Sequence, residues 1–232
     1  MGLSGNPDIA TYLTEYLGRE RVVPGKMVED LGKRWLLKEI WIKKYPVCFM
    51  QHRHIDMIIA LKKEQNLSFD DVEAIEVHAR RSREEACNRP DPKTEGDLQF
   101  SFQHNMAVAM MCGDITLEYI TPAAVTDPKW REAWKKVQYI VDYPPGAPGG
   151  SIQEPARIVV RMKDGRSFIR ERQFPIGHPK EPLTPGQFQE FFDKFSKGIL
   201  SGKDNQKTSQ FILNLEKMEN VRDLMDILRM AG

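Results

Sequence analysis

The chain has 232 residues, and its 34 lysines and arginines nearly balance 33 aspartates and glutamates, which gives a formal net charge of +1. A composition with 41% hydrophobic and 29% charged residues excludes wholesale disorder, and the balanced charge argues against a dedicated nucleic-acid or membrane-surface protein. The longest apolar run, residues 106–112, is far shorter than the roughly 20 residues that a membrane span needs. This length predicts one large domain, or one domain with appendages.

The amino-terminal residues and the cysteines predict a cytoplasmic protein. No basic segment followed by an apolar run marks a secretion signal. Cys48, Cys87 and Cys112 are widely spaced and odd in number, so they predict neither a disulfide framework nor a Cys-x-x-Cys metal site. We interpret all three as inert rather than nucleophilic, because no sequence pattern indicates an activated thiolate.

After a polar lead-in over residues 1–34, the hydrophobic pattern predicts strands mixed with helices. Branched, aromatic or alternating runs predict strands at 35–42, 72–79, 137–143, 156–162 and 167–174. Apolar spacing, caps and helix-starting prolines predict helices at 9–17, 54–65 and 98–112, from 122, 128 and 185, and at 207–217 and 219–230. Charged or Pro/Gly-rich stretches predict loops at 80–96 and 144–150.

Asp164 and Gly165 lie between two alternating runs, which predicts a β-hairpin. Together the elements predict an α+β fold: a mostly antiparallel sheet with helices packed on it. We expect three parts, namely the lead-in 1–34, an α+β domain over 35–200, and carboxy-terminal helices over 201–232.

The first candidate site is the basic segment 43–54. It contains Lys43, Lys44 and His52, and it lies between a predicted strand and a predicted helix. Ammonium groups, imidazole donors and the free N–H groups of a helix start all favour a carboxylate. A solvated basic turn is the alternative, since exposed charges are common.

The second candidate is the segment 100–105, where Ser101 and His104 share a helix face. His104 borders the apolar run, so we expect its ring to be desolvated, which lowers the pKa and keeps the ring neutral as a general base requires. A core histidine satisfied by one backbone carbonyl is the alternative. Elsewhere, His78 and His178 have no partner at metal-ligand spacing, and the sequence carries no Gly-rich phosphate loop.

Both candidate segments resemble motifs of the MmgE/PrpD family, which includes dehydratases, decarboxylases and epimerases. Residues 43–48 (KKYPVC) with His52 resemble its Lys-Pro-Tyr-Pro-x-Cys motif and the His that follows. Residues 100–113 resemble its Phe-Ser-Leu-x-Tyr-Ala-Val-Ala helix, and residues 177–184 resemble its Gly-x-Pro-x-Asn-Pro-Leu-Ser segment. The ordered set covers roughly residues 30–232 and corresponds to the family's carboxy-terminal, lid-type domain.

The resemblance implies proton abstraction next to a carboxylate or thioester, followed by loss of water, loss of carbon dioxide or reprotonation, with no metal or organic cofactor. Two departures matter. His104 stands where the family has Tyr, and Lys44 stands where it has Pro. In addition, the family's large all-helical domain, which supplies most catalytic groups, has no counterpart in these residues.

We therefore expect the small subunit of a two-chain lyase, a hydratase or dehydratase, or of an isomerase. The expected partners are a separate helical chain of the same family and a small carboxylate substrate, in an oligomer without nucleic acid or membrane. In this hypothesis His104 is the base or acid, His52 is a second catalytic group that orients or binds, Lys43 binds a substrate carboxylate, and Ser101 is a weaker substrate-binding candidate. The alternatives are a non-catalytic binding or regulatory module and a fragment of a longer enzyme.

Overall fold

The computed structural model describes residues 9–23, 25–26, 29–79, 82–142 and 155–230. They belong to two compact units, residues 1–40 and 41–232. In the first unit, helix α1 (Ile9–Leu17) forms as expected and ends before Gly18, whose φ of 92° favours a residue without a side chain. The boundaries predicted at residues 34 and 200 remain predictions.

The strand predicted at 35–42 is wrong. Leu36–Glu39 forms a short 3₁₀ turn, η2, and Leu37 is 72% exposed. The segment has the branched and aromatic composition of a strand, but the described sheet does not include it. Composition favours a strand only where a neighbouring strand can pair with it and cover one face.

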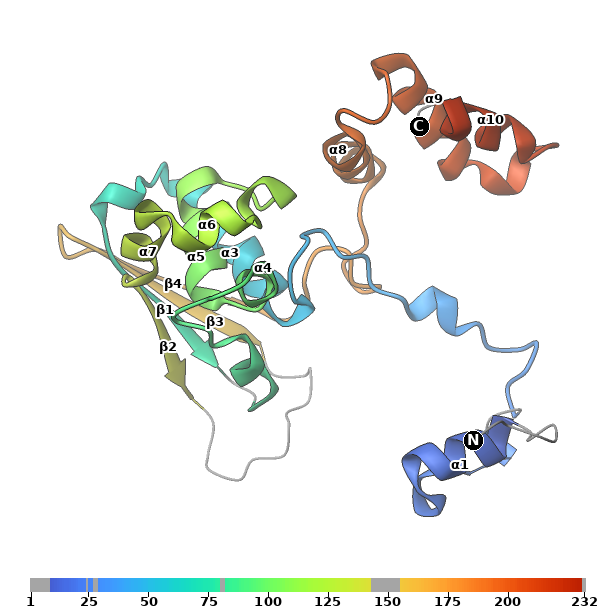
Figure 1. Ribbon diagram of the computed structural model, residues 1–232, viewed down its shortest axis with the longest axis horizontal. Helices are drawn as coiled ribbons and strands as arrows, with labels where there is room; N and C mark the ends of the chain where they lie inside the picture. The colour runs from blue at the N-terminus through green and yellow to red at the C-terminus, as the bar shows by residue number, and fades with distance from the viewer. Residues whose placement is uncertain (1–8, 24, 27–28, 80–81, 143–154, 231–232) are drawn as a thin grey trace. The chain divides into compact units, whose positions relative to one another are not determined.

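The described strands of the second unit form a four-stranded sheet in the order β2-β1-β3-β4 (Figure 1). The strands are β1 (Val72–Ala79), β2 (Val137–Val141), β3 (Ala156–Met162) and β4 (Ser167–Arg172). The β1–β3 and β3–β4 pairs are antiparallel, and the expected hairpin turns at Gly165, whose φ is 88°. The β1–β2 pair is parallel, so the sheet is mixed. The α+β class is confirmed.

Helices α3 (His52–Gln65) and α5 (Phe102–Cys112) cover one face of this sheet (Figure 1). Helix α3 packs on β3 and β4, and α5 packs on β2 and on α7 (Pro128–Trp134). Residues of these elements form the fully buried core, among them Ile55, Ile58, Leu61, Ile75, Val77, Met106, Met110, Ile158 and Val160. Helix α5 is buried almost all round, which agrees with its uninterrupted apolar run.

The helix predicted at 98–112 is two helices, α4 (Glu95–Gln99) and α5. Thr94 caps α4, and Asp97, the third residue of α4, completes a capping box with it. Ser101 begins α5 instead, and its side chain accepts a hydrogen bond from the backbone N–H of His104. Thr94 and Ser101 each cap a helix, so the segment predicted as one helix forms two.

The remaining expected helices form with small shifts. Thr121 and Asp127 cap α6 (Pro122–Thr126) and α7, each with proline at a first position, and Thr184 caps α8 (Pro185–Ser196). Ser201 caps α9 (Gly202–Leu213), which therefore begins earlier than the predicted residue 207 and is followed by α10 (Arg222–Met230). The charged stretch 80–96 contains a 3₁₀ segment, η5 (Ser82–Cys87), and the loop predicted at 144–150 lies outside the described residues.

Candidate functional site

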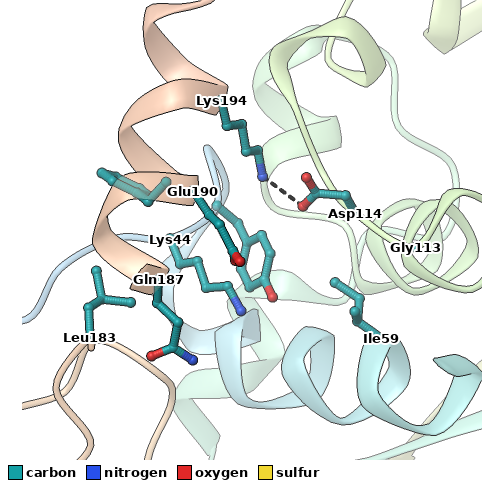
Figure 2. Close-up of a pocket in the computed structure, with 10 residues that line it drawn as sticks. Lys44, Ile59, Gly113, Asp114, Leu183, Gln187, Glu190 and Lys194 are labelled. Carbon is teal, nitrogen blue, oxygen red and sulfur yellow. Dashed lines mark hydrogen bonds and ion pairs between the residues drawn. The ribbon is translucent and has the colours of Figure 1, made fainter. Parts of the chain in front are cut away.

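A cavity of about 320 Å³ opens beside the Tyr45 ring, between helix α3, the end of α5 and helix α8 (Figure 2). Its polar lining contains two ammonium groups, from Lys44 and Lys194, and two carboxylates, from Asp114 and Glu190. The complete lining is Lys44, Tyr45, Ile59, Gly113, Asp114, Leu183, Gln187, Glu190, Phe191 and Lys194. Because the charges of the lining balance, the cavity suits a small polar molecule better than a bare anion.

Lys44 and Lys194 both lie against the Tyr45 ring. The Nζ atoms of Lys44 and Lys194 are 5.1 and 5.4 Å from its centroid, a cation–π geometry. Lys194 also pairs with Asp114 at 2.6 Å (Figure 2). Burial lowers the pKa of Lys194, and the pairing with Asp114 opposes this effect.

Asp56 is a buried carboxylate that holds the segment around Tyr45 in place. Its Oδ1 accepts from the Tyr45 hydroxyl at 2.8 Å and from Lys44 Nζ at 3.2 Å. Its Oδ2 accepts from the backbone N–H of Ile176 at 2.9 Å. The Tyr45 pKa is raised well above its usual value by burial first and then by the Asp56 charge, so the phenol stays protonated and remains a donor.

Lys43 and Lys44 have different environments although they are adjacent. Lys44 is half-buried in the cavity, whereas Lys43 is exposed and makes no ion pair within the described part of the chain. The Lys43 charge is nevertheless close enough to His52 and Cys48 to lower the pKa of each. The charge of Lys43 therefore acts on His52, the second candidate of the basic segment.

His52 begins α3 and is fully buried. Its ring packs edge-on against Tyr45, with centroids 5.2 Å apart, and lies tilted against Phe49, with centroids 5.5 Å apart. Neither ring nitrogen makes a well-formed hydrogen bond with any described residue. Burial lowers the pKa of His52 to about 4, while the charge of Asp56 and the nearby backbone of Val47 and Tyr45 oppose this effect. The ring is neutral near pH 7 and faces mostly aromatic surface.

His104 lies in the core, and both of its ring nitrogens are bonded. The Trp134 indole donates to Nδ1 at 3.1 Å, so Nε2 carries the proton and donates to the backbone oxygen of Tyr119 at 2.8 Å. Trp130 packs edge-on against the same ring. Burial lowers the pKa of His104 to about 4, as its apolar neighbours led us to expect.

This geometry matches the alternative interpretation, a core histidine satisfied by a backbone carbonyl, and adds the Trp134 indole as a second partner. His104 is 0% exposed, so a substrate can meet it only if the surrounding packing opens. Its catalytic role, like that of His52, stays a prediction.

Ser101 is also buried, and its hydroxyl is engaged inside the fold. It donates to the backbone oxygen of Arg89 at 2.7 Å and accepts from the His104 N–H at 3.0 Å. The two candidate segments contact each other directly, since Asn105 Nδ2 of the second segment donates to Gln51 Oε1 of the first at 2.9 Å. Lys43 and Ser101 therefore belong to one connected region, but only Lys43 has a solvent-facing polar group.

Sequence reasoning missed the partners that bury the charges of this region. Arg53 and Glu84 form an ion pair at 2.8 Å with side chains 3% and 0% exposed, which ties α3 to η5. The partners are distant in sequence, and no local spacing indicates them. For Asp56 there was a signal, because a lone carboxylate stands within an apolar helical stretch and must be paired if it is buried.

Two of the cysteines border segments that pack on each other. Cys48 precedes the 3₁₀ turn η3 (Phe49–Gln51) and Cys87 ends η5, which packs on η3. The influence of the Cys87 thiol chiefly lowers the pKa of Cys48 to about 6, with help from the Met50 backbone and Lys43. The influence of Cys48, together with burial, raises the pKa of Cys87.

Within the described residues, no group of three or more His, Cys, Asp or Glu side chains is placed to hold a metal ion. None of the described helices is both long enough and apolar enough to cross a bilayer.

Comparison with known proteins places the chain in a family. Residues 45–217 match the model of the MmgE/PrpD C-terminal domain, so the chain belongs to the MmgE/PrpD family. It is similar to cis-aconitate decarboxylase from Homo sapiens, with 26% identity over 238 residues that cover 99% of this chain and 48% of the relative. The cis-aconitate decarboxylase from Mus musculus is 26% identical over 204 residues, or 84% of this chain and 40% of the relative. The chain thus spans about half the length of these curated relatives or less.

Proposed function

We propose that the chain is the lid-type part of a cofactor-independent MmgE/PrpD lyase that removes carbon dioxide or water from a small polycarboxylate. One observation supports this most strongly. In the segment that resembles a family motif, Lys43 is exposed and makes no ion pair with a described residue, while its neighbour Lys44 is held by Asp56. An ammonium group without a protein partner is available to a substrate carboxylate.

The chemistry that Lys43 would supply is electrostatic. In decarboxylation the bond between the carboxyl carbon and its neighbour breaks, carbon dioxide leaves, and the electron pair stays on the substrate until a proton replaces it. An ammonium group beside the remaining carboxylate stabilises this charge as it develops. In dehydration the same contact would stabilise the carbanion that forms before water leaves.

The proton-transfer groups of the proposed enzyme are divided between this chain and its partner. His52 and His104 are both neutral near pH 7, as a general base must be, but both are buried. We place the remaining substrate-binding and proton-transfer groups on a separate helical chain of the same family. Docking of that chain is the event that would bring a substrate to the Lys43 side of the segment.

The test is to isolate the protein from its native host through an affinity tag and to record the intact masses of everything that co-purifies. The assembly is then incubated with cis-aconitate, the substrate named for its relatives, and with 2-methylcitrate, while NMR follows the consumption of substrate. The trimethyl ester of cis-aconitate is the matched control, because it keeps the carbon skeleton and lacks the charges. We expect turnover of an acid and none of the ester. An assembly that binds these acids but never converts them overturns the lyase proposal.

A second candidate function is a non-catalytic binding module, and the burial of both candidate histidines favours it. Such a module would bind a carboxylate through Lys43 or dock on a partner without chemistry. Isolation of this chain as a self-oligomer that binds the acids without turnover is the result that distinguishes it from the enzyme.

A further inference from the structure

The cavity beside Tyr45 has no role in the proposed reaction, and one face of helix α8 forms much of its wall. Gln187, Glu190, Phe191 and Lys194 follow one another at intervals of three, one and three residues, so they lie on one side of the helix. Figure 2 shows Gln187, Glu190 and Lys194 pointing from this helix into the cavity. The wall therefore combines an amide, a carboxylate, an aromatic ring and an ammonium group within about two helical turns.

Both ammonium groups of the cavity keep hydrogen-bond donors for a ligand. Lys44 Nζ pairs with the buried Asp56 at 3.2 Å, and Lys194 Nζ pairs with Asp114 at 2.6 Å. An ammonium group has three N–H donors, and each of these pairs uses one of them. The cavity can therefore donate to a carboxylate without breaking either ion pair.

Glu190 supplies the opposite charge. Its side chain makes no ion pair with a residue in the described part of the chain, in contrast to Asp114 on the other side of the cavity. Gln187 lies one turn before it, and its Oε1 accepts from the backbone N–H of Thr184 at 3.0 Å. This bond fixes the amide and leaves its Nε2 donors for a ligand. The apolar part of the lining consists of Ile59, Leu183 and Phe191.

We propose that this cavity binds an α-amino acid with an apolar side chain. The ligand's ammonium group pairs with Glu190, and its carboxylate accepts from the lysines and from Gln187. A simple anion would meet the carboxylates of Glu190 and Asp114, and a simple amine would meet two ammonium groups, so a molecule with both charges fits best. The volume of about 320 Å³ is at the lower end of the range for small-molecule sites, roughly 300–1,000 Å³. The site is argued independently of the proposed reaction.

The test titrates the full, ¹⁵N-labelled chain with L-leucine and follows the backbone amide resonances by NMR. We expect saturable shifts at Gly113 and along α8, which line the cavity, and none along α7. Two analogues keep the leucine side chain and each lack one charge: 3-methylbutylamine has no carboxylate, and 4-methylpentanoate has no ammonium group. Each should bind at least about 10-fold more weakly than leucine, because a hydrogen-bonded charge is lost.

Two variants assign the ammonium contact. Glu190→Gln should weaken leucine binding about 10-fold or more and leave the binding of 4-methylpentanoate unchanged. Glu216→Gln, the matched control, changes an exposed glutamate of η7 (Leu215–Lys217) and should bind leucine as the unaltered chain does. Both glutamates are exposed, so neither exchange disturbs the core.

Three results would overturn the proposal. The first is a titration in which leucine causes no saturable shifts at the cavity. The second is an analogue that binds as tightly as leucine, which would indicate a site for a simple anion or a simple amine. The third is a Glu190→Gln variant that keeps the full affinity for leucine.

Discussion

The segments 43–54 and 100–105 carry similar residues, yet they have opposite environments. In the second, His104 is enclosed by two tryptophans and a backbone carbonyl, and Ser101 caps its own helix. In the first, Lys43 is exposed and His52 is buried without a well-formed hydrogen bond. A fully satisfied cluster stabilises the core, whereas the exposed ammonium of Lys43 is open to solvent. This difference is the reason why the proposed function rests on the first segment.

The largest effect expected from this comparison is on stability. Replacing His104 by Ala removes a packed ring and leaves the Trp134 N–H and the Tyr119 oxygen without partners. We expect the free energy of unfolding to fall by about 4 kcal/mol, measured by urea denaturation at pH 7. A loss below 1 kcal/mol would mean that His104 is not part of a tightly packed core and would revive the case for an accessible base.

The pH dependence of stability comes next, because its contribution from each titrating ring is smaller than the loss expected for His104→Ala. In the folded chain the pKa values of His52 and His104 are about 4, below the value of about 6.5 expected when the chain is unfolded. The unfolded state therefore binds more protons between these values, and stability falls as the pH drops from about 6.5 towards 4. Each ring should account for roughly 3 kcal/mol of this loss.

Urea midpoints at pH 7, 5.5 and 4.5 measure this dependence. Replacing His104 by Phe keeps a ring in the core and removes one titrating group, so the fall in stability with acid should become shallower. Stability that does not change between pH 7 and pH 4.5 contradicts the burial of both rings.

A smaller effect is expected at the cavity. Changing Tyr45 to Phe removes only the hydroxyl that donates to Asp56 at 2.8 Å, while Lys44 and the Ile176 N–H still pair with the carboxylate. We expect a loss of about 1.5 kcal/mol in the free energy of unfolding, the range of one hydrogen bond to a charged group. An unchanged stability would show that the remaining donors compensate fully.

The smallest stability effect is expected at Lys43. This side chain is exposed and makes no ion pair with a described residue, so Lys43→Ala should change the free energy of unfolding by less than about 0.5 kcal/mol. Thermal denaturation beside the unaltered chain measures it. A loss comparable to that of His104→Ala would place Lys43 in the structural framework and remove the contrast between the two segments.

Local patterns predicted most of the fold, because caps, periodicity and turn residues act over a few positions. Thr121, Asp127 and Thr184 begin helices as expected, and Gly165 turns the hairpin. The failure at 35–42 has a non-local cause, since a strand forms only where another strand pairs with it.

The candidate site was predictable in part, for the same reason. The desolvation of His104 follows from its immediate neighbours in sequence. The hydrogen bond between Tyr45 and Asp56 joins elements whose relative placement no spacing reveals. The interpretation of the three cysteines as inert stays a prediction, although the surroundings of Cys48 lower its pKa to about 6.

The most direct test of the account is a kinetic comparison of Lys43→Ala with Lys63→Ala in the assembly isolated from the native host. Lys63 is also an exposed lysine, near the end of α3 and outside the basic segment, and serves as the matched control. If Lys43 binds a substrate carboxylate, kcat/KM should fall about 10- to 100-fold for Lys43→Ala and less than about twofold for Lys63→Ala. Equal activity of the two variants would contradict the assignment of the basic segment as the carboxylate-binding site.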